Sequence, residues 1–327
     1  HHMMGLPAAI GELIRRKGIP YVITLHDYWW GCANAQLLTN DREELCEGPE
    51  RWINCGRCAL ARAGLQQGAW AAPAIAPLFA YRERRLRPIL EGAQRLIAPT
   101  TFTREMYRKM GLPVGKVDVI PHGIRLREAW SPSRVERPGS GCLRVAYVGG
   151  IARQKGVHVL VEAINRLSYE EVQLSIFGDL SLYPDYVAEL RALSQHPGIR
   201  FEGSIANPDL LPRLATADVL VVPSIWYETA ALVIQEAFAA GIPVIASDIG
   251  ALRERVRHGG DGLLVPPGDA DALHAALRRL LDKPSLLPRL RAGIGPVRTI
   301  DEQVDEIEEL YRTVISQTQG ATPRDRS

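Results

Sequence analysis

The stretch that decides the fold spans residues 221–250 and reads VVPSIWYETAALVIQEAFAAGIPVIASDIG. Two short apolar runs, 219–223 and 242–247, are typical of strands that are buried on both faces of a parallel sheet. We expect one helix between them, beginning near Thr229 because the hydroxyl of this residue can cap a helix. The helix should end at Gly241, since glycine tolerates the left-handed backbone that often follows a helix.

Two carboxylates flank the start of this predicted helix. Glu228 lies in the loop after the first strand, and Glu236 lies about two turns into the helix, so both can line one cleft. Ligands of an open α/β sheet bind beyond the carboxyl ends of the strands, where a helix N-terminus can hold a phosphate. The candidate backbone amides are those of Thr229, Ala230, Ala231 and Leu232. A solvated capping residue and a surface helix residue are the simpler interpretation of two glutamates.

The residues that flank the two glutamates favour the functional interpretation. Glu228 and Glu236, followed by Ala-Phe-Ala-Ala-Gly-Ile-Pro-Val, resemble the Glu-x7-Glu region of the retaining family 4 glycosyltransferases of GT-B fold. The resemblance implies an α/β protein with two Rossmann-like domains, whose parallel sheets face each other across a cleft. It also implies that Glu228 holds the hydroxyls of the donor sugar and that Glu236 holds the ribose.

A second site resembles the same family. Residues 143–150, LRVAYVGG, predict a buried strand that runs into Gly149 and Gly150, and a helical run follows Lys155. By the resemblance, Lys155 reaches the diphosphate of the donor. The helix dipole disfavours a cation at this position, so a bound anion explains Lys155 better than exposure to solvent does. Many relatives carry an arginine where this chain has Gly150, and Arg153 is the candidate to replace it.

Two further strand ends complete the expected donor site. The resemblance implies that the nucleotide base is lined by Gly178, Asp179, Ser204 and Ile205. Lys155, with Arg153 and helix N-termini, would stabilise the charge that develops on the leaving diphosphate, so catalysis needs no cofactor. We therefore predict a retaining transfer of a sugar from a nucleoside diphosphate donor of UDP or GDP type to a glycan or lipid-linked acceptor.

A non-catalytic nucleotide-binding or interaction subunit is the alternative to an enzyme. A dinucleotide-dependent oxidoreductase is rejected, because no Gly-x-Gly-x-x-Gly follows a predicted strand.

Length and composition agree with an ordinary globular protein. A chain of 327 residues predicts about two domains, and its apolar content is 46%. The net charge of +2 is too small to indicate a nucleic-acid partner. No apolar run approaches the roughly 20 residues that span a bilayer. The first residues lack the apolar core of a signal peptide, so we expect a cytoplasmic protein.

The order of strand and helix patterns predicts two domains. Residues 1–129 carry three strand patterns and form a partial, acceptor-side N-terminal domain. Residues 130–141 are rich in Pro, Gly, Ser and charge, which is typical of a linker. Residues 142–299 alternate six strand patterns with helices and form the domain that binds the nucleotide sugar. Residues 300–327 form a closing helix and tail.

The N-terminal domain departs from the pattern of the family. A complete one has a larger sheet whose first strand leads into a glycine-rich loop, and this sequence begins after that point. Three strands would leave an apolar sheet edge, which further N-terminal residues or a partner chain would have to cover. We therefore expect a truncated domain, and a chain that binds donor but transfers sugar slowly.

One landmark of the family's N-terminal domain is present. Residues 24–27, Thr-Leu-His-Asp, follow a buried strand where the family has a histidine that points at the donor sugar. His26 is therefore the third catalytic candidate, beside Lys155 and Glu228, and a hydrogen-bonded structural histidine is the alternative. Thr101 and the Pro-His-Gly-Ile at 121–124 match later loops of the domain, without a catalytic role for the histidine.

Four of the five cysteines lie in the segment 28–60, namely Cys32, Cys46, Cys55 and Cys58. A structural zinc ion would order this segment, which has little predicted secondary structure, and the thiolates would be its ligands. Only one Cys-x-x-Cys pair is present, so reduced thiols packed as small apolar groups are an equal alternative. Disulfides suit a cytoplasmic protein less well. Cys142 is predicted to lie in the core.

Two other charged patterns have simple explanations. Asp269 and Asp271 precede an apolar-periodic run, so we expect a helix cap there and no metal. Residues 82–85, Arg-Glu-Arg-Arg, form a basic helix face that either makes a peripheral contact with anionic lipid or is solvated.

Overall fold

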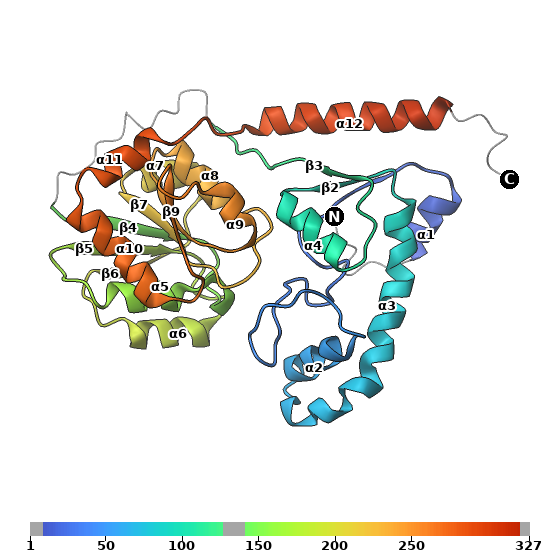
Figure 1. The fold of residues 1–327 in the computed structure, drawn as a ribbon, viewed down its shortest axis with the longest axis horizontal. Coiled ribbons are helices and arrows are strands. Elements are labelled where there is room, and N and C mark those ends of the chain that lie inside the picture. The colour runs from blue at the N-terminus through green and yellow to red at the C-terminus, as the bar shows by residue number, and fades with distance from the viewer. Residues whose placement is uncertain (1–8, 127–140, 321–327) are drawn as a thin grey trace. The chain divides into compact units, whose positions relative to one another are not determined.

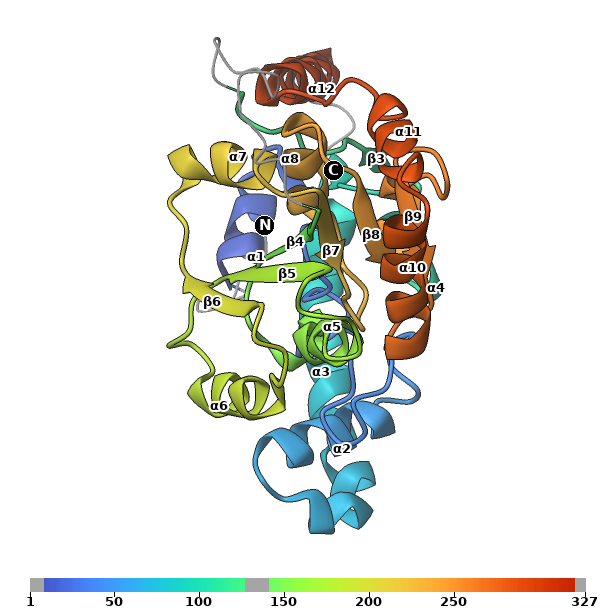
Figure 2. The ribbon, with the colours of Figure 1, turned by 90° about the vertical axis from the view of Figure 1, so that its left-hand side faces the viewer.

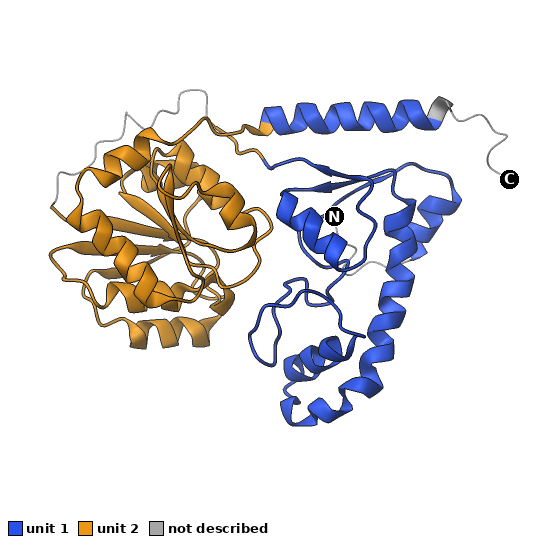
Figure 3. Ribbon diagram, in the orientation of Figure 1, with its two compact units in different colours: residues 1–122, 301–327 blue, residues 123–300 orange. Residues whose placement is uncertain are grey.

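A computed structural model describes residues 9–126 and 141–320, and the chain divides into two compact units. Unit 1 contains residues 1–122 and 301–327, and unit 2 contains residues 123–300 (Figure 3). The predicted linker, 130–141, lies outside the described residues except for Gly141.

The sheet of unit 1 has three parallel strands in the described residues, in the order β1-β2-β3 (Figure 1). All three follow the apolar patterns of the sequence: β1 Val22–Thr24, β2 Arg95–Ala98 and β3 Val117–Val119. The helices of this unit are α1 Ala9–Arg16, α2 Ile53–Arg62, η1 Gln66–Ala71, α3 Ala72–Gly92, α4 Thr101–Lys109 and α12 Ile300–Gly320. The predicted closing helix is thus α12, and its Gln303 side chain lies 3.1 Å from His122 Nδ1.

The cysteine-rich segment is more regular than its sequence suggests. Residues 25–52 carry no helix or strand, as expected, but α2 begins at Ile53 and places Cys55 and Cys58 one turn apart. The helix forms because it can pack closely on the start of α3: a Cβ at Gly56 would come within 2.6 Å of the Ala72 carbonyl oxygen. The expectation of an irregular segment up to residue 60 is therefore wrong for α2.

The sheet of unit 2 has six parallel strands in the order β6-β5-β4-β7-β8-β9. Their bounds are β4 Leu143–Val148, β5 Val172–Phe177, β6 Ile199–Gly203, β7 Val219–Val222, β8 Val244–Ser247 and β9 Gly262–Val265. The helices are η3 Arg153–Lys155, α5 Val157–Ile164, α6 Pro184–Leu193, α7 Asn207–Ala215, α8 Leu232–Ala239, α9 Gly250–Arg255, α10 Ala270–Asp282 and α11 Leu286–Ala292. The strand order reverses direction between β4 and β7, which makes this pair the switch point of the sheet.

Helices cover both faces of the unit 2 sheet, because alternate residues of each strand point to opposite faces (Figure 2). On one face Val145, Val219 and Ile245 pack with α5, α6 and α10. On the other face Ala146 and Leu220 pack with α7, α8 and α9. The continuous apolar runs of the sequence are explained by these two cores.

An ion-pair cluster lies at the amino-terminal end of β7. Asp218 precedes this strand and accepts hydrogen bonds from Arg144 of β4 at 2.9 and 3.0 Å and from Arg291 of α11 at 2.9 Å. Burial raises the pKa of Asp218, but the hydrogen bonds from Arg144 and Arg291 outweigh burial and hold the pKa below its usual value.

A search for membrane-spanning helices within the described ranges finds none that is both long and apolar enough.

Candidate functional site

The candidate site lies at the carboxyl ends of β4 and β7 in unit 2. The loops that follow these strands touch each other, since the Ile225 amide donates to the Gln154 carbonyl oxygen at 2.9 Å. The carboxyl ends of β5 and β6 lie at the same edge of the sheet. The Gly149 amide donates a hydrogen bond to the Phe177 carbonyl oxygen, and the Gly178 amide donates one to the Gly203 carbonyl oxygen. In sheets of this order, ligands bind at this edge and beside the switch point.

Two glycines make this close contact of the loops feasible. Gly156 has a φ of 70°, and a Cβ there would lie 1.9 Å from the Pro223 carbonyl oxygen. A Cβ at Gly178 would lie 2.2 Å from the Gly149 carbonyl oxygen. Gly150 is different, because a Cβ there would meet no atom within 4 Å. The predicted glycine turn thus has an open surface at Gly150.

The centre of the site is the carboxylate of Glu228, which is 7% exposed. Its Oε1 accepts hydrogen bonds from Lys155 Nζ at 2.7 Å, Ser224 Oγ at 2.7 Å and Trp226 Nε1 at 2.9 Å. Within the described residues these donors all reach Oε1, so Oε2 is the oxygen left for a ligand hydroxyl. Lys155 Nζ also lies 5.0 Å from the centroid of the Trp226 ring.

Ser224 and Trp226 were missed by the sequence analysis. Each is a polar or aromatic residue directly after a buried strand, which was the only available signal. Their role depends on the turn that folds them back onto Glu228, and this turn has no residue pattern of its own.

The start of helix α8 differs from the prediction. The helix begins at Leu232, and the residue at its N-cap is Ala231 instead of Thr229. Ala231 adopts φ 47° and ψ 61°, a left-handed conformation that alanine rarely takes. No residue pattern in the sequence predicts this conformation. Glu236 therefore lies about one turn into the helix. The predicted end is confirmed, since Gly241 follows the helix with a φ of 69°.

Glu236 lies beside a cavity of about 490 Å³. The cavity is also lined by Ile124, Arg125, Asn207 and the first residues of α7. Burial alone raises the pKa of Glu236. A half-buried carboxylate beside a cavity can accept hydrogen bonds from ligand hydroxyls.

The other predicted donor residues are spread along the same edge. Arg153 pairs with Glu189 of α6 and lies over the Tyr186 ring, so it is held by α6. Asp179 accepts hydrogen bonds from both the amide and the hydroxyl of Ser181, which lower its pKa. Ser204 and Ile205 line a separate open cavity at the ends of β5 and β6.

His26 follows β1 in unit 1, at the strand end where the sequence analysis placed it. Its Nε2 lies 3.5 Å from Asp27 Oδ2, and the side chain is about one-third exposed. The backbone around it is fixed, because the Tyr107 hydroxyl donates to the Asp27 carbonyl oxygen at 2.6 Å. The catalytic role of His26 stays a prediction.

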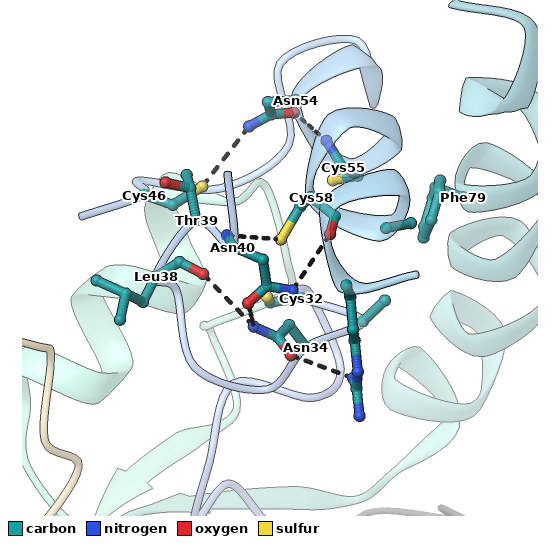
Figure 4. Close-up of a pocket in the computed structure, with 13 residues that line it drawn as sticks. Cys32, Asn34, Leu38, Thr39, Asn40, Cys46, Asn54, Cys55, Cys58 and Phe79 are labelled. Carbon is teal, nitrogen blue, oxygen red and sulfur yellow. Dashed lines mark hydrogen bonds between the residues drawn. The ribbon is translucent and has the colours of Figure 1, made fainter. Parts of the chain in front are cut away.

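The four clustered cysteines line one cavity in unit 1, together with residues of α2 and the preceding segment (Figure 4). Burial, and after it the charges of Cys32, Cys46 and Cys58, raise the pKa of Cys55 to about 12. The thiols are therefore close enough to interact. No group of three or more His, Cys, Asp or Glu side chains in the described ranges is already arranged to hold a metal ion.

Residues 82–85 are not one solvated basic face. Arg82 packs 4.6 Å from the centroid of the Trp29 ring, and Glu83 accepts a hydrogen bond from Trp52 Nε1. Arg84 and Arg85 remain exposed. Asp269 caps α10 through the Ala272 amide, as predicted. Cys142 is half-buried just before β4 and so lies at the margin of the core.

Comparison with known families defines the class of this protein. Residues 1–128 match the family described as Glycosyltransferase Family 4, and residues 142–283 match Glycosyl transferases group 1. The chain therefore belongs to the family 4 glycosyltransferases, whose relatives use nucleotide-sugar donors. Its parallel sheets of three and six strands are those of a GT-B-like α/β fold.

Individual relatives agree with this assignment. Glycogen synthase of Mycobacterium tuberculosis is 32% identical over 203 residues, which are 62% of this chain and 48% of that protein. The structure of sucrose-phosphate synthase from Thermosynechococcus elongatus has 28% identity and a TM-score of 0.61, covering 73% of this chain and 62% of that one. An Anabaena protein crystallised with UDP-glucose has 22% identity and a TM-score of 0.60, covering 76% and 77%. The chain spans about half the length of curated relatives such as the glycogen synthase.

Proposed function

We propose that this protein transfers a sugar, with retention of anomeric configuration, from a nucleoside diphosphate sugar to a glycan or lipid-linked acceptor. The observation that carries the proposal is the Lys155–Glu228 pair at the switch point of the unit 2 sheet. A cation that can contact a diphosphate and a carboxylate that can accept sugar hydroxyls stand side by side at one strand end. A nucleotide sugar presents both of the groups that this pair can bind, a diphosphate and sugar hydroxyls.

The charges around the pair support the same orientation of the donor. The N-cap of α8, Ala231, has no side-chain oxygen that could bond to the first amides of the helix. Together with Lys155, these amides and the helix dipole stabilise negative charge on a leaving diphosphate, so the transfer needs no metal ion. In this proposal Glu236 holds the ribose beside its cavity, and the base occupies the cavity at Ser204 and Ile205.

The nucleoside diphosphate of the donor is UDP or GDP. The Anabaena relative crystallised with UDP-glucose makes UDP the first nucleotide to test. The five free cysteines suit a reducing compartment, which is consistent with a cytoplasmic pool of donor.

A lipid-linked acceptor would bring the protein to a membrane surface, and unit 1 offers a face for this contact. Trp70 of η1 is 84% exposed, and Leu78 and Tyr81 of α3 are exposed three residues apart. Arg84 and Arg85 continue the exposed side of α3 and can contact anionic headgroups. Sedimentation with anionic phospholipid vesicles should fall in Trp70→Ala, while Leu65→Ala serves as a matched exposed apolar control. Equal sedimentation of the Trp70 variant and the wild type would contradict the proposed membrane contact.

A panel of nucleoside diphosphates tests the donor proposal, with thermal unfolding of the intact chain as the readout. The cognate nucleotide at 100 times its dissociation constant should stabilise the protein by about 2.7 kcal/mol. No stabilisation by any member of the panel would contradict the proposal. Retention is then tested by NMR of the first product, where the anomeric proton should show the configuration of the donor. A non-catalytic binding subunit would show nucleotide binding without any product.

A further inference from the structure

The cavity lined by the four cysteines is small, at about 90 Å³. Its sulfurs come from three places in the chain. Cys32 lies in a turn in which the Cys32 amide donates to the Tyr28 carbonyl oxygen. Cys46 directly follows the Leu38–Leu45 bridge, and its amide donates to the Leu37 carbonyl oxygen. Cys55 and Cys58 lie on α2 (Figure 4). Cysteines that are up to 26 positions apart therefore meet at one point of unit 1.

Hydrogen-bond donors already point at two of these sulfurs. The Asn40 amide donates to Cys58 Sγ at 3.4 Å, and the Gly48 amide donates to Cys46 Sγ at 3.4 Å. Asn54 Nδ2 lies 3.6 Å from the same Cys46 sulfur. Donors of this kind satisfy the lone pairs of a thiolate and orient it, which is the usual support for a metal ligand. The Cys46 thiol in turn donates to the Gly48 carbonyl oxygen at 3.3 Å, and it must release this proton when a metal ion binds.

A positive charge lies close to the cluster as well. Arg82 of α3 is held over Trp29, and its guanidinium interacts electrostatically with Cys32 and Cys55. Four thiolates around a divalent cation leave a net negative charge. A partly buried guanidinium beside them offsets that charge and lowers the free energy of the site.

The backbone around the cysteines is strained in a way that needs an external constraint. Five non-glycine residues between positions 35 and 52 have positive φ, namely Ala35, Leu37, Glu43, Arg51 and Trp52. Each such conformation costs of order 1–3 kcal/mol and persists only where the surroundings impose it. Residues 25–52 have no regular helix or strand to supply this, although Tyr28, Trp30 and Leu37 are buried.

We propose that Cys32, Cys46, Cys55 and Cys58 bind one zinc ion, which fixes residues 28–52 against α2. Four sulfur ligands in a tetrahedron are the preferred set for structural zinc. Zinc–sulfur bonds of about 2.3 Å bring the sulfurs to about 3.8 Å from one another. Since no group of the described side chains is arranged around a metal position, the cysteine side chains must rotate toward one another when zinc binds. Each thiol loses its proton in this step.

The zinc site is independent of the sugar-transfer proposal, because it lies in unit 1 and its readout is metal content. The intact chain is purified without a metal-affinity step, passed through a chelating resin and analysed for metals. We expect one zinc per chain. Cys142→Ser, which removes the cysteine outside the cluster, should keep this zinc, whereas Cys58→Ser should lose most of it. A wild-type chain with less than about a fifth of an equivalent of zinc, or with iron instead, would overturn the proposal.

A second measurement does not depend on the folding of any variant. A mercurial reagent that titrates thiols should release zinc from the wild-type chain in step with the modification of four cysteines, as a metallochromic dye reports. Cobalt that replaces the zinc should give the intense visible absorption of a tetrahedral thiolate site. Zinc that stays bound after all thiols are modified would show an adventitious ion elsewhere and would refute the site. Intact mass that reveals disulfides among the four cysteines would refute it equally.

Discussion

Lys155 Nζ donates a 2.7 Å hydrogen bond to Glu228 Oε1, and this contact joins the loops after β4 and β7 across 73 positions of sequence. A donor diphosphate that approaches Lys155 must share or replace this bond. Glu228 does not lose its place when that happens, because Ser224 and Trp226 hold the same oxygen. In the proposed mechanism the lysine can therefore turn toward phosphate while the carboxylate stays in place for the sugar.

Glu228→Gln should separate recognition of the sugar from recognition of the nucleotide. The glutamine oxygen can still accept the bonds from Ser224 and Trp226, but the second oxygen is replaced by a donor. Affinity for the cognate nucleotide sugar should fall about tenfold, since a bond to a charged acceptor is lost. Affinity for the nucleoside diphosphate alone should stay within about threefold. Calorimetry with both ligands measures the two constants.

Glu171→Gln is the matched control for this variant, because Glu171 lies at the amino end of β5 and pairs with Arg278. Both affinities should be unchanged in it. Equal loss of affinity for sugar-bearing and sugar-free nucleotide in the Glu228 variant would contradict the assigned role.

Glu236→Gln should stabilise the protein while weakening donor binding. Burial raises the pKa of Glu236, so the folded state favours the neutral carboxyl. The stability that this group contributes is present below its unfolded pKa and is lost as the pH rises through the folded pKa. Glutamine avoids that loss, so the melting temperature should exceed that of the wild type at pH 7 and approach it near pH 4. A variant that is less stable than the wild type at pH 7 would show that Glu236 has a stabilising partner.

Asp218→Ala should destabilise unit 2 by about 3 kcal/mol, because it leaves Arg144 and Arg291 without their partly buried partner. The pKa of Asp218 is lowered, so its contribution is present above the usual aspartate pKa and is lost as the pH falls through the lowered value. The difference between variant and wild type should therefore shrink in acid. Denaturant unfolding across pH measures it.

Asp271→Ala is the matched control for the Asp218 variant. Its carboxylate pairs with Arg166 on the surface, where an ion pair contributes little. A change of similar size in both variants would mean that burial of the Asp218 cluster is not the cause.

Gly156→Ala should unfold or strongly destabilise unit 2, since Gly156 needs a φ of 70° and its Cβ would overlap the Pro223 carbonyl. Gly150→Ala is the contrasting substitution in the same loop, because the space around Gly150 is open. Because we expect a negligible change in the free energy of unfolding, the melting temperature of this variant should match that of the wild type to within about 1 °C. Differential scanning calorimetry of both variants tests the loop geometry, and equal stability of the two variants would refute it.

The strands could be predicted because each is a short apolar run closed by turn residues, and all nine in the described residues lie where these runs indicated. Helix α2 was missed because its pattern of Ile53, Ala59 and Leu60 is weak and because the helix depends on packing against α3. The start of α8 was misplaced, since nothing in the sequence distinguishes a left-handed Ala231 from a helical one.

Only some residues of the candidate site could be predicted from the sequence, and their contacts could not, for a similar reason. Lys155 and Glu228 each stood out by their position after a buried strand, but their direct contact depends on a sheet order that puts β4 beside β7. Arg82 was assigned to an exposed face because its neighbours are charged, whereas its stacking on Trp29 is a tertiary contact.

Binding of the cognate nucleoside diphosphate to Lys155→Ala, measured by isothermal titration calorimetry, tests the central claim most directly. Loss of a charged donor to phosphate should weaken binding about 10- to 100-fold. Lys283→Ala, at the exposed C-cap of α10, removes the same charge from unit 2 without reaching the site and should bind like the wild type. A Lys155 variant that binds as tightly as the Lys283 control would contradict the assignment of the donor site to the carboxyl ends of β4 and β7.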